Sequence, residues 1–172
     1  EVELKFQIAE TRRSALLKAL DPKKSEIIQL QAKYYDTPDR QLSQHGAALR
    51  QRLEGTHWVQ TLKAATKSHL SRFEDNTNLG ELAEAPDLNL DIYKEKPEAL
   101  SILKNALGEQ FEGLQLQFET DIQRTMRVIQ FEDSEIEICV DVGEVRTENA
   151  KQDIYEVEFE LKSGSIQSLL AF

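Results

Sequence analysis

Carboxylates occupy every second residue near both ends of this chain, inside stretches that are rich in strand-forming residues. The first stretch reads EVELKF and carries Glu1 and Glu3, and the last reads YEVEFELK and carries Glu156, Glu158 and Glu160. Residues two apart in a β-strand project from the same face of a sheet, so each stretch presents a row of like charges on one side. Such a row has to face water, a metal cation or a cluster of bases.

The same period of two recurs along most of the chain and predicts about eight strands. These strands are expected at residues 1–8, 27–36, 47–54, 58–64, 71–76, 114–130, 134–142 and 152–162. Helical spacing predicts a short helix over residues 11–20 and a second over 97–107, with Pro97 in its first turn and Gly108 near its end. The last residues, GSIQSLLAF, are typical of a helix that is cut short.

Composition restricts the class of protein. A chain of 172 residues with 40% hydrophobic residues suits one domain with a real core. Its net charge of −10 argues against nucleic acid or an anionic membrane as a partner. No run of about 18 apolar residues and no signal peptide is visible. The single cysteine, Cys139, favours a reducing compartment such as the cytoplasm.

An alternating sheet of this kind can be built in two ways. Its charged face can meet solvent, as in most antiparallel sheets, or the sheet can close into a barrel whose charged residues line the inside. Arginines occur in segments separate from the carboxylate row, so one wall of a barrel would be basic and another acidic: Arg50, Arg52, Arg72 and Arg124. This combination favours a ligand with several negative oxygens, held by guanidinium groups and by divalent cations that bridge to carboxylates. Polyphosphate with Mg²⁺ is the obvious candidate.

Several motifs occur in an order that resembles one known family. EVELK matches an ExExK signature, and it is followed by YYDTPDRQL, ALRQR, WVQTLKAA, the Arg72-x-Glu74 pair, TDIQR and YEVEFELKSG. The ordered set, which covers nearly the whole chain, resembles the CYTH superfamily, the triphosphate tunnel metalloenzymes.

The resemblance implies an α+β fold that is predominantly antiparallel β. We expect an eight-stranded closed tunnel barrel with a few flanking helices, forming a single domain over residues 1–172 with the last helix truncated. Bacterial members of the family often continue into a second, helical domain, so a further C-terminal domain is also expected in the full-length protein.

The resemblance also implies roles for particular residues. The metal-site carboxylates would be Glu1, Glu3, Glu156 and Glu158, holding Mg²⁺ or Mn²⁺, while Glu137, Asp141 and Glu160 match the family less firmly. The phosphate-binding set would be Lys5, Arg50, Arg52, Lys63, Arg72 and Arg124. Lys63 and Tyr34 would act together in catalysis. Because carboxylates stacked with like-charged neighbours resist ionisation, we expect the acidic row to ionise fully only when a cation binds.

The function implied is metal-dependent hydrolysis of inorganic tripolyphosphate to diphosphate and phosphate, with the small-molecule triphosphate as partner. Thiamine triphosphatase and class IV adenylate cyclase are alternatives, because they share the barrel. A module that binds polyphosphate or a nucleotide without cleaving it is a third hypothesis. A structural β domain with a solvated charged face is the fourth.

Overall fold

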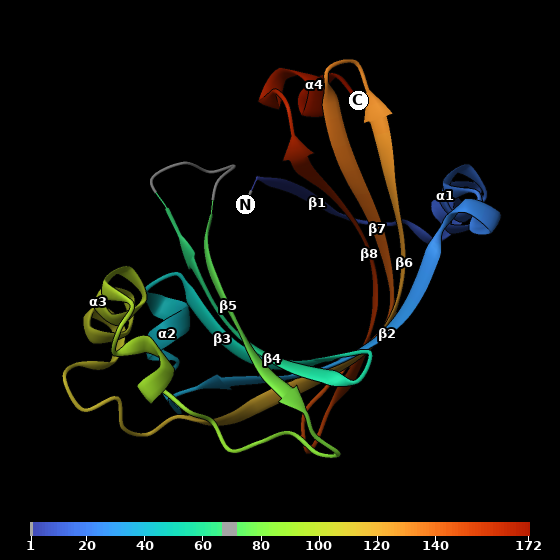
Figure 1. Ribbon diagram of the computed structural model, residues 1–172. Helices are drawn as coiled ribbons and strands as arrows, with labels where there is room; N and C mark the ends of the chain where they lie inside the picture. The colour runs from blue at the N-terminus through green and yellow to red at the C-terminus, as the bar shows by residue number, and fades with distance from the viewer. Residues whose placement is uncertain (1, 67–71) are drawn as a thin grey trace.

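The computed structural model describes residues 2–66 and 72–172 and forms one antiparallel sheet with helices on its outer side (Figure 1). The strands are β1 (Glu3–Gln7), β2 (Glu26–Asp36), β3 (Ala47–Glu54), β4 (His57–Ala65), β5 (Arg72–Glu81), β6 (Gln115–Phe131), β7 (Ser134–Arg146) and β8 (Lys151–Ser163). The helices are α1 (Arg13–Leu20), α2 (Gln41–Gln44), α3 (Pro97–Leu107) and α4 (Ile166–Ala171).

The eight strands follow the order β1-β8-β7-β6-β2-β3-β4-β5, and every pair is antiparallel. The sheet curls strongly, so that its two edge strands, β1 and β5, approach each other (Figure 1). In the described residues no backbone ladder joins these edges, and Arg72 Nη1 of β5 instead lies 3.0 Å from Glu3 Oε1 of β1. The predicted eight-stranded antiparallel fold is therefore confirmed, except that a side-chain ion pair spans the seam where hydrogen-bonded closure was expected.

The predicted elements are present, and the main differences lie at their ends. β5 continues to Glu81 and β7 to Arg146, beyond the limits that alternation suggested. The short helix α2 was not predicted from the sequence. Its formation depends on Asp36, whose buried carboxylate accepts hydrogen bonds from the backbone amides of Thr37, Leu42 and Ser43. These bonds satisfy amides that a helix start leaves without partners.

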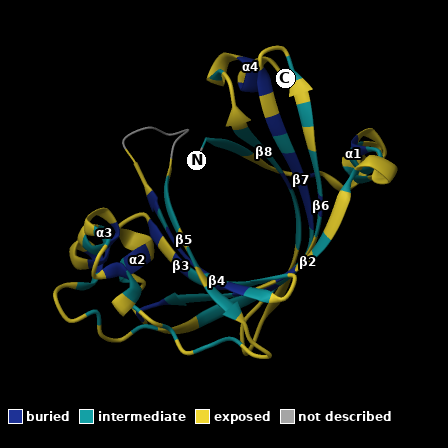
Figure 2. Cartoon of the chain, in the orientation of Figure 1, coloured by how far each residue is buried: buried dark blue, intermediate teal, exposed yellow. Residues whose placement is uncertain are grey.

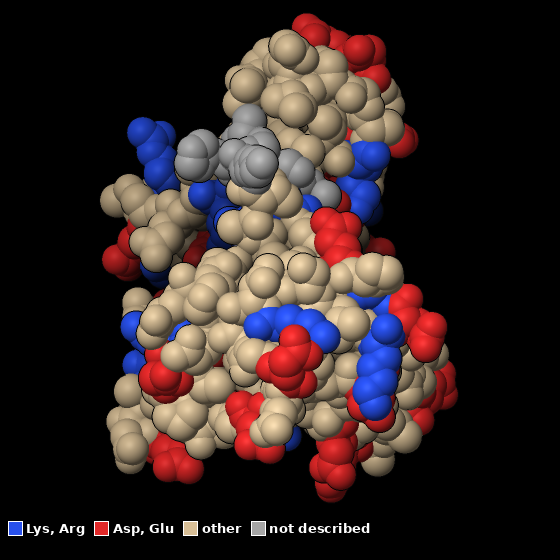
Figure 3. Space-filling view, turned by 90° about the vertical axis from the view of Figure 1, so that its left-hand side faces the viewer, with Lys and Arg blue, Asp and Glu red and all other residues tan. Residues whose placement is uncertain are grey.

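Buried and more exposed residues alternate along several strands, as expected for a sheet whose two faces differ (Figure 2). On β3, Leu49 and Gln51 are buried on the outer face, while Arg50 and Arg52, which alternate with them, lie on the inner face of the curled sheet. Figure 3 shows that the outside of the molecule carries basic and acidic side chains intermingled, with no large area of one sign in that view.

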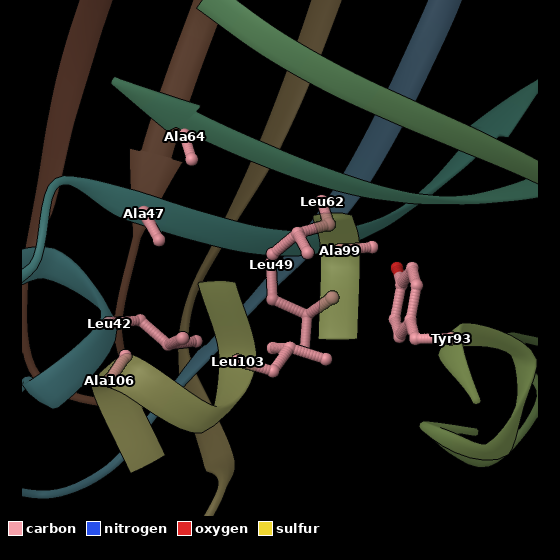
Figure 4. Close-up of a cluster of buried hydrophobic side chains, with 9 residues drawn as sticks. All are labelled: Leu42, Ala47, Leu49, Leu62, Ala64, Tyr93, Ala99, Leu103 and Ala106. Atoms are coloured by element: carbon pink, nitrogen blue, oxygen red, sulfur yellow. The ribbon is translucent and has the colours of Figure 1, made fainter. Parts of the chain in front are cut away.

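One hydrophobic core lies between α3 and the outer face of β3 and β4 (Figure 4). Its buried members are Leu42, Ala47, Leu49, Leu62, Ala64, Tyr93, Ala99, Leu103 and Ala106. Tyr93 comes from the irregular segment 82–96, which alternation did not place. The buried amide of Gln60 fixes this segment, because Nε2 donates to the carbonyl of Asn89 at 2.7 Å and Oε1 accepts from the Asn89 amide at 3.3 Å.

A second core lies between α1, α4 and the outer faces of β7 and β8. Its buried members are Ile8, Leu20, Ile136, Ile138, Val140, Val157 and Leu169. Val2 and Leu4 pack against this core, as the sequence predicts. Phe6, on the same side of β1 as Leu4, is 52% exposed, and its ring packs edge-to-face with that of Phe159 at 6.1 Å between centroids. Two separate cores thus hold the two halves of the curved sheet.

None of the helices in the described ranges combines the length and the apolar character that a membrane span requires.

Removal of a core side chain should unfold the protein at lower denaturant concentration. Leu103→Ala should reduce the free energy of unfolding by about 2–5 kcal/mol, because Leu103 is fully buried between α3 and the sheet. Leu82→Ala is the control, since Leu82 is 45% exposed and should change stability by no more than about 0.5 kcal/mol. Urea unfolding followed by circular dichroism measures both, and equal effects of the two substitutions would contradict the assignment of the core.

Candidate functional site

A cavity of about 430 Å³ opens inside the curled sheet. Charged side chains from five strands line it: Glu3 and Lys5 of β1, Arg50 of β3, Lys63 of β4, Arg72 of β5 and Glu158 of β8. Tyr34 of β2 lines the cavity as well. The sheet therefore brings seven of the sequence-predicted site residues to one place.

Strand register explains how these side chains meet. Arg50 lies opposite Tyr34 on β2 and opposite Thr61 on β4, and directly opposed residues in adjacent strands share a face of the sheet. Lys63 lies opposite Glu74 on β5, with Nζ 2.9 Å from Oε2. Lys5 lies opposite Glu158 on β8. Period-two alternation therefore puts each charged residue on the concave face together with its neighbours.

The remaining predicted residues do not line this cavity. Arg52 lies beyond it and forms an ion pair with Glu54, two residues along the same strand. Arg124 and Glu156 do not line the cavity either, and each forms an ion pair, Arg124 with Asp141 and Glu156 with Lys5. Glu1 lies outside the described residues.

Lys5 is held between two carboxylates of β8. Its Nζ lies 2.6 Å from Glu156 Oε2 and 3.0 Å from Glu158 Oε1. Burial of Lys5 favours the neutral amine, but the charges and hydrogen bonds of Glu158 and Glu156 outweigh burial and raise the pKa of Lys5. Lys5 is thus firmly cationic, and both neighbouring carboxylates are engaged with it.

Arg124 forms the deepest ion-pair cluster. Its Nε and Nη2 donate to the two oxygens of Asp141 at 2.7 and 2.6 Å, and Nη2 also donates to Glu158 Oε2 at 2.6 Å. The Asp141 side chain is only 4% exposed, so this two-pronged pair is shielded from water. Asp141 has a structural role here that its weak motif match did not reveal.

Glu158 ionises differently from the expectation for the acidic row. We predicted that like-charged neighbours would hinder ionisation until a metal arrived. Burial does oppose ionisation of Glu158, but Arg124 and Lys5, with a smaller contribution from Lys63, hold the pKa of Glu158 below its usual range. The prediction was wrong for this residue because alternation shows which side chains share a face and does not show that cations are interleaved among them.

The basic wall carries positive charge that is incompletely balanced. Burial lowers the pKa of Arg52, and the nearby Arg50 and Arg124 lower it further, against the opposing effect of Glu54. Within the described part of the chain, Arg50 Nε is buried without a hydrogen-bond partner. A buried donor without a partner is costly, so Arg50 is suited to receive an anionic oxygen from a ligand.

The carboxylates have the chemistry that a divalent cation requires, since Mg²⁺ and Mn²⁺ prefer oxygen ligands. Glu3 and Glu158 line the cavity, and Glu156 lies beside them on β8. Across residues 2–66 and 72–172, however, no three acidic, histidine or cysteine side chains converge closely enough to hold a metal as they stand. These carboxylates therefore have the right chemistry to bind such an ion, but each of them forms an ion pair with a lysine or an arginine.

A second cavity of about 430 Å³ adjoins the first and shares with it Tyr34, Ser43 and two alanines of β3. Its wall is more apolar, and it includes the stacked rings of Tyr34 and Phe118, whose centroids are 4.5 Å apart. Sequence reasoning identified neither Ser43 nor Phe118 as a site residue. Ser43 depends on the unpredicted helix α2, whereas Phe118 could have been found from its place on the inner face of β6.

Comparison with known proteins gives the family. The model of the CYTH domain matches residues 1–172, which is the whole chain. The chain belongs to the CYTH domain family. The resemblance inferred from the ordered strand motifs is thereby confirmed.

One characterised relative is similar in sequence to this chain. This CYTH domain is 35% identical over 142 residues to an inorganic triphosphatase of Haemophilus influenzae, an alignment that covers 81% of the chain and 38% of that relative. The chain therefore spans well under half the length of this relative.

Solved structures share the fold at low sequence identity. A candidate adenylate cyclase of Bacillus halodurans superposes with a TM-score of 0.64 at 19% identity, over 99% of this chain and 84% of the other. A candidate adenylyl cyclase of Hippeastrum, described as having a dominant triphosphatase activity, gives a TM-score of 0.62 at 19% identity with the same coverage. These structures support the fold, and they do not by themselves select an activity.

The depressed pKa of Glu158 predicts a pH dependence of stability in the absence of metal. Its ionised form contributes stability above the ordinary glutamate pKa, and this contribution is lost as the pH falls through the lower pKa of the folded state. Glu158→Gln should therefore be less stable than the wild type at pH 7, and the difference should shrink as the pH falls toward 3. Urea unfolding in EDTA at several pH values measures it, with the exposed Glu148→Gln as control. A difference that stays constant or grows on acidification would contradict the assigned ion pairs.

Proposed function

We propose that this CYTH domain hydrolyses a triphosphate, with inorganic tripolyphosphate as the leading substrate and diphosphate and phosphate as products. The observation that carries the proposal is one cavity bounded by four cations, Lys5, Arg50, Lys63 and Arg72, and by the carboxylates of Glu3 and Glu158. A surface that only met solvent would have no reason to gather these groups around one cavity. The 35% identity to an inorganic triphosphatase supports the same activity.

The cations would bind and align the phosphate chain. Arg50 offers a guanidinium with an unused buried donor, and Lys63 and Arg72 approach the same space from the next two strands. Phosphoryl transfer to water depends chiefly on neutralising the phosphates and holding them in line with the attacking oxygen. Charged donors fixed on strands meet that requirement, because their backbone positions are set by the hydrogen-bonded ladder.

Lys63 and Tyr34 are proposed to act nearest to the bond that breaks. Both line the cavity, and Lys63 is oriented by its ion pair with Glu74. Lys63 Nζ would donate a hydrogen bond to the oxygen that becomes negative as the phosphate leaves. The Tyr34 hydroxyl would orient the phosphate chain or the attacking water by hydrogen bonding.

Mg²⁺ or Mn²⁺ is proposed as the cofactor, with Glu3, Glu156 and Glu158 as its protein ligands and Glu1 as a further candidate. When bound, such an ion supplies charge neutralisation of the phosphates and a more acidic water. The protein's own contribution would be to hold carboxylate oxygens on the wall formed by β1 and β8, across from the basic residues of β3 and β4. Cytoplasmic location and a further domain after residue 172 stay predictions.

A phosphate-release assay with tripolyphosphate and Mg²⁺ tests the proposal. Arg50→Gln should lower kcat/KM by roughly 100-fold, because a charged donor to the phosphates is lost. Lys151→Gln is the matched control, since Lys151 is an exposed cation that forms an ion pair with Glu144 and lies outside the cavity. Glu3→Gln should abolish most turnover while tripolyphosphate still binds. No turnover by the wild type, or equal activity of the Arg50 and Lys151 variants, would refute the proposed function.

The apolar cavity next to the charged one favours a second candidate substrate, a triphosphate with an aromatic substituent such as thiamine triphosphate or a nucleotide. The stacked Tyr34 and Phe118 rings would contact that substituent while the phosphates occupy the charged cavity.

Phe118→Ala separates the two substrates. It should lower kcat/KM for thiamine triphosphate or ATP by about three- to tenfold while leaving tripolyphosphate turnover within about twofold of the wild type. Steady-state kinetics with all three substrates measure the effect. An equal loss on every substrate would show that the aromatic pair supports the fold or the phosphate site and has no contact with a substituent.

A further inference from the structure

Most cations proposed to bind phosphate are already paired with acidic side chains, and several of these are the proposed metal ligands. Lys5 contacts Glu156 and Glu158, and Arg72 contacts Glu3. Arg124 contacts Glu158 from the opposite side. The positive and negative side chains of the site therefore neutralise each other.

The carboxylates in these ion pairs are largely buried. The side chains of Glu3 and Glu158 are 10% and 17% exposed, and that of Glu156 is 23% exposed. A carboxylate that is largely withdrawn from water depends on its cation, because the lost hydration is replaced only by the ion pair and its hydrogen bonds. A ligand that draws the cation away from such a carboxylate therefore leaves the carboxylate in need of another positive charge.

A metal ion or a triphosphate that binds alone has to break these ion pairs without replacing both partners. A divalent ion that binds Glu156 and Glu158 would bring its positive charge next to Lys5, and it would have to displace that ammonium group. A triphosphate that recruits Lys5 and Arg72 would place its negative oxygens beside Glu3 and Glu158. Both arrangements put like charges together in a partly desolvated space, where repulsion is stronger than in bulk water.

The two ligands together remove the obstacle. As Lys5 and Arg72 turn from the carboxylates to the phosphates, the carboxylates become available as oxygen ligands. The metal then replaces the lysine and arginine charges beside the acidic row, and the phosphates replace the carboxylates beside the cations. We propose that a divalent metal ion and a triphosphate bind this site as a mutually dependent pair, each taking up side chains that the other releases. This inference rests on the proposed function, because it assumes the same two ligands.

Arg50 differs from Lys5 and Arg72 because it is not paired with a proposed metal ligand. Within residues 2–66 and 72–172 no ion pair of Arg50 is found, and its buried Nε has no hydrogen-bond partner. Arg50 would therefore bind phosphate without releasing any carboxylate. Loss of Lys5 and loss of Arg50 should both weaken triphosphate binding, but only loss of Lys5 should free acidic side chains for a metal ion.

Isothermal titration calorimetry on the full chain tests this difference with each ligand alone. The probes are Mn²⁺ without phosphate and a methylene-bridged triphosphate, which cannot be hydrolysed, in the presence of EDTA. Lys5→Gln should tighten Mn²⁺ binding by about fivefold or more and weaken binding of the analogue. Arg50→Gln should weaken the analogue and leave Mn²⁺ affinity within about twofold of the wild type. Lys151→Gln should change neither affinity.

A second variant guards against misfolding of the first. Arg72→Gln removes the partner of Glu3 and should also tighten Mn²⁺ binding. In the wild type, saturation with the analogue should raise Mn²⁺ affinity by about 5- to 150-fold, after correction for the complex that Mn²⁺ forms with the analogue in protein-free titrations.

The proposal is overturned if folded Lys5→Gln and Arg72→Gln proteins bind Mn²⁺ no more tightly than the wild type. Its failure is distinguishable from failure of the proposed function. Tripolyphosphate turnover without any gain in Mn²⁺ affinity would reject the mutual dependence alone. A gain in Mn²⁺ affinity in a protein that cleaves no triphosphate would support the ion-pair exchange and reject the hydrolytic function.

Discussion

The rest of this structure depends on ion pairs between charges that face the inside of a curled sheet. One continuous chain of alternating sign runs across β7, β6, β8 and β1, in the order Asp141, Arg124, Glu158, Lys5 and Glu156. Charges of one sign could not be packed together on this concave face without a large cost in desolvation and repulsion. With that face polar, the apolar residues must lie on the outer face, and helices α1, α3 and α4 cover them there.

Much of the fold follows from alternation in the sequence, because a period of two fixes which face of a strand each side chain occupies. It placed Arg50 apart from Leu49, and Lys5 apart from Leu4, as the structure has them. Alternation could not fix how far along the inner face of the sheet each side chain lies. Arg52 and Arg124 were therefore grouped with Arg50, although they do not line the cavity. That position depends on the register of neighbouring strands, and register is set by pairing between segments that are distant in the sequence.

Other features depend on contacts that no local pattern contains. Helix α2 forms because the buried Asp36 carboxylate caps it, and Ser43 enters the site only as a consequence. The pKa of Glu158 is lowered by partners that are distant in the sequence, Arg124 and Lys5. The resemblance to the family suggested which residues to assign to phosphate and to metal, whereas the structure shows which of their charges neutralise each other.

The central claim is that a triphosphate occupies the charged cavity with a divalent ion on its acidic side. The most direct measurement is a crystal structure with the methylene-bridged triphosphate and Mn²⁺, using anomalous scattering to locate the metal. The account predicts phosphate oxygens within hydrogen-bonding distance of Arg50 and Lys63, Mn²⁺ bound to Glu3 or Glu158, and Lys5 moved from the carboxylates to the phosphates. A phosphate chain bound outside the cavity, or Mn²⁺ bound away from the carboxylates of β1 and β8, would contradict it.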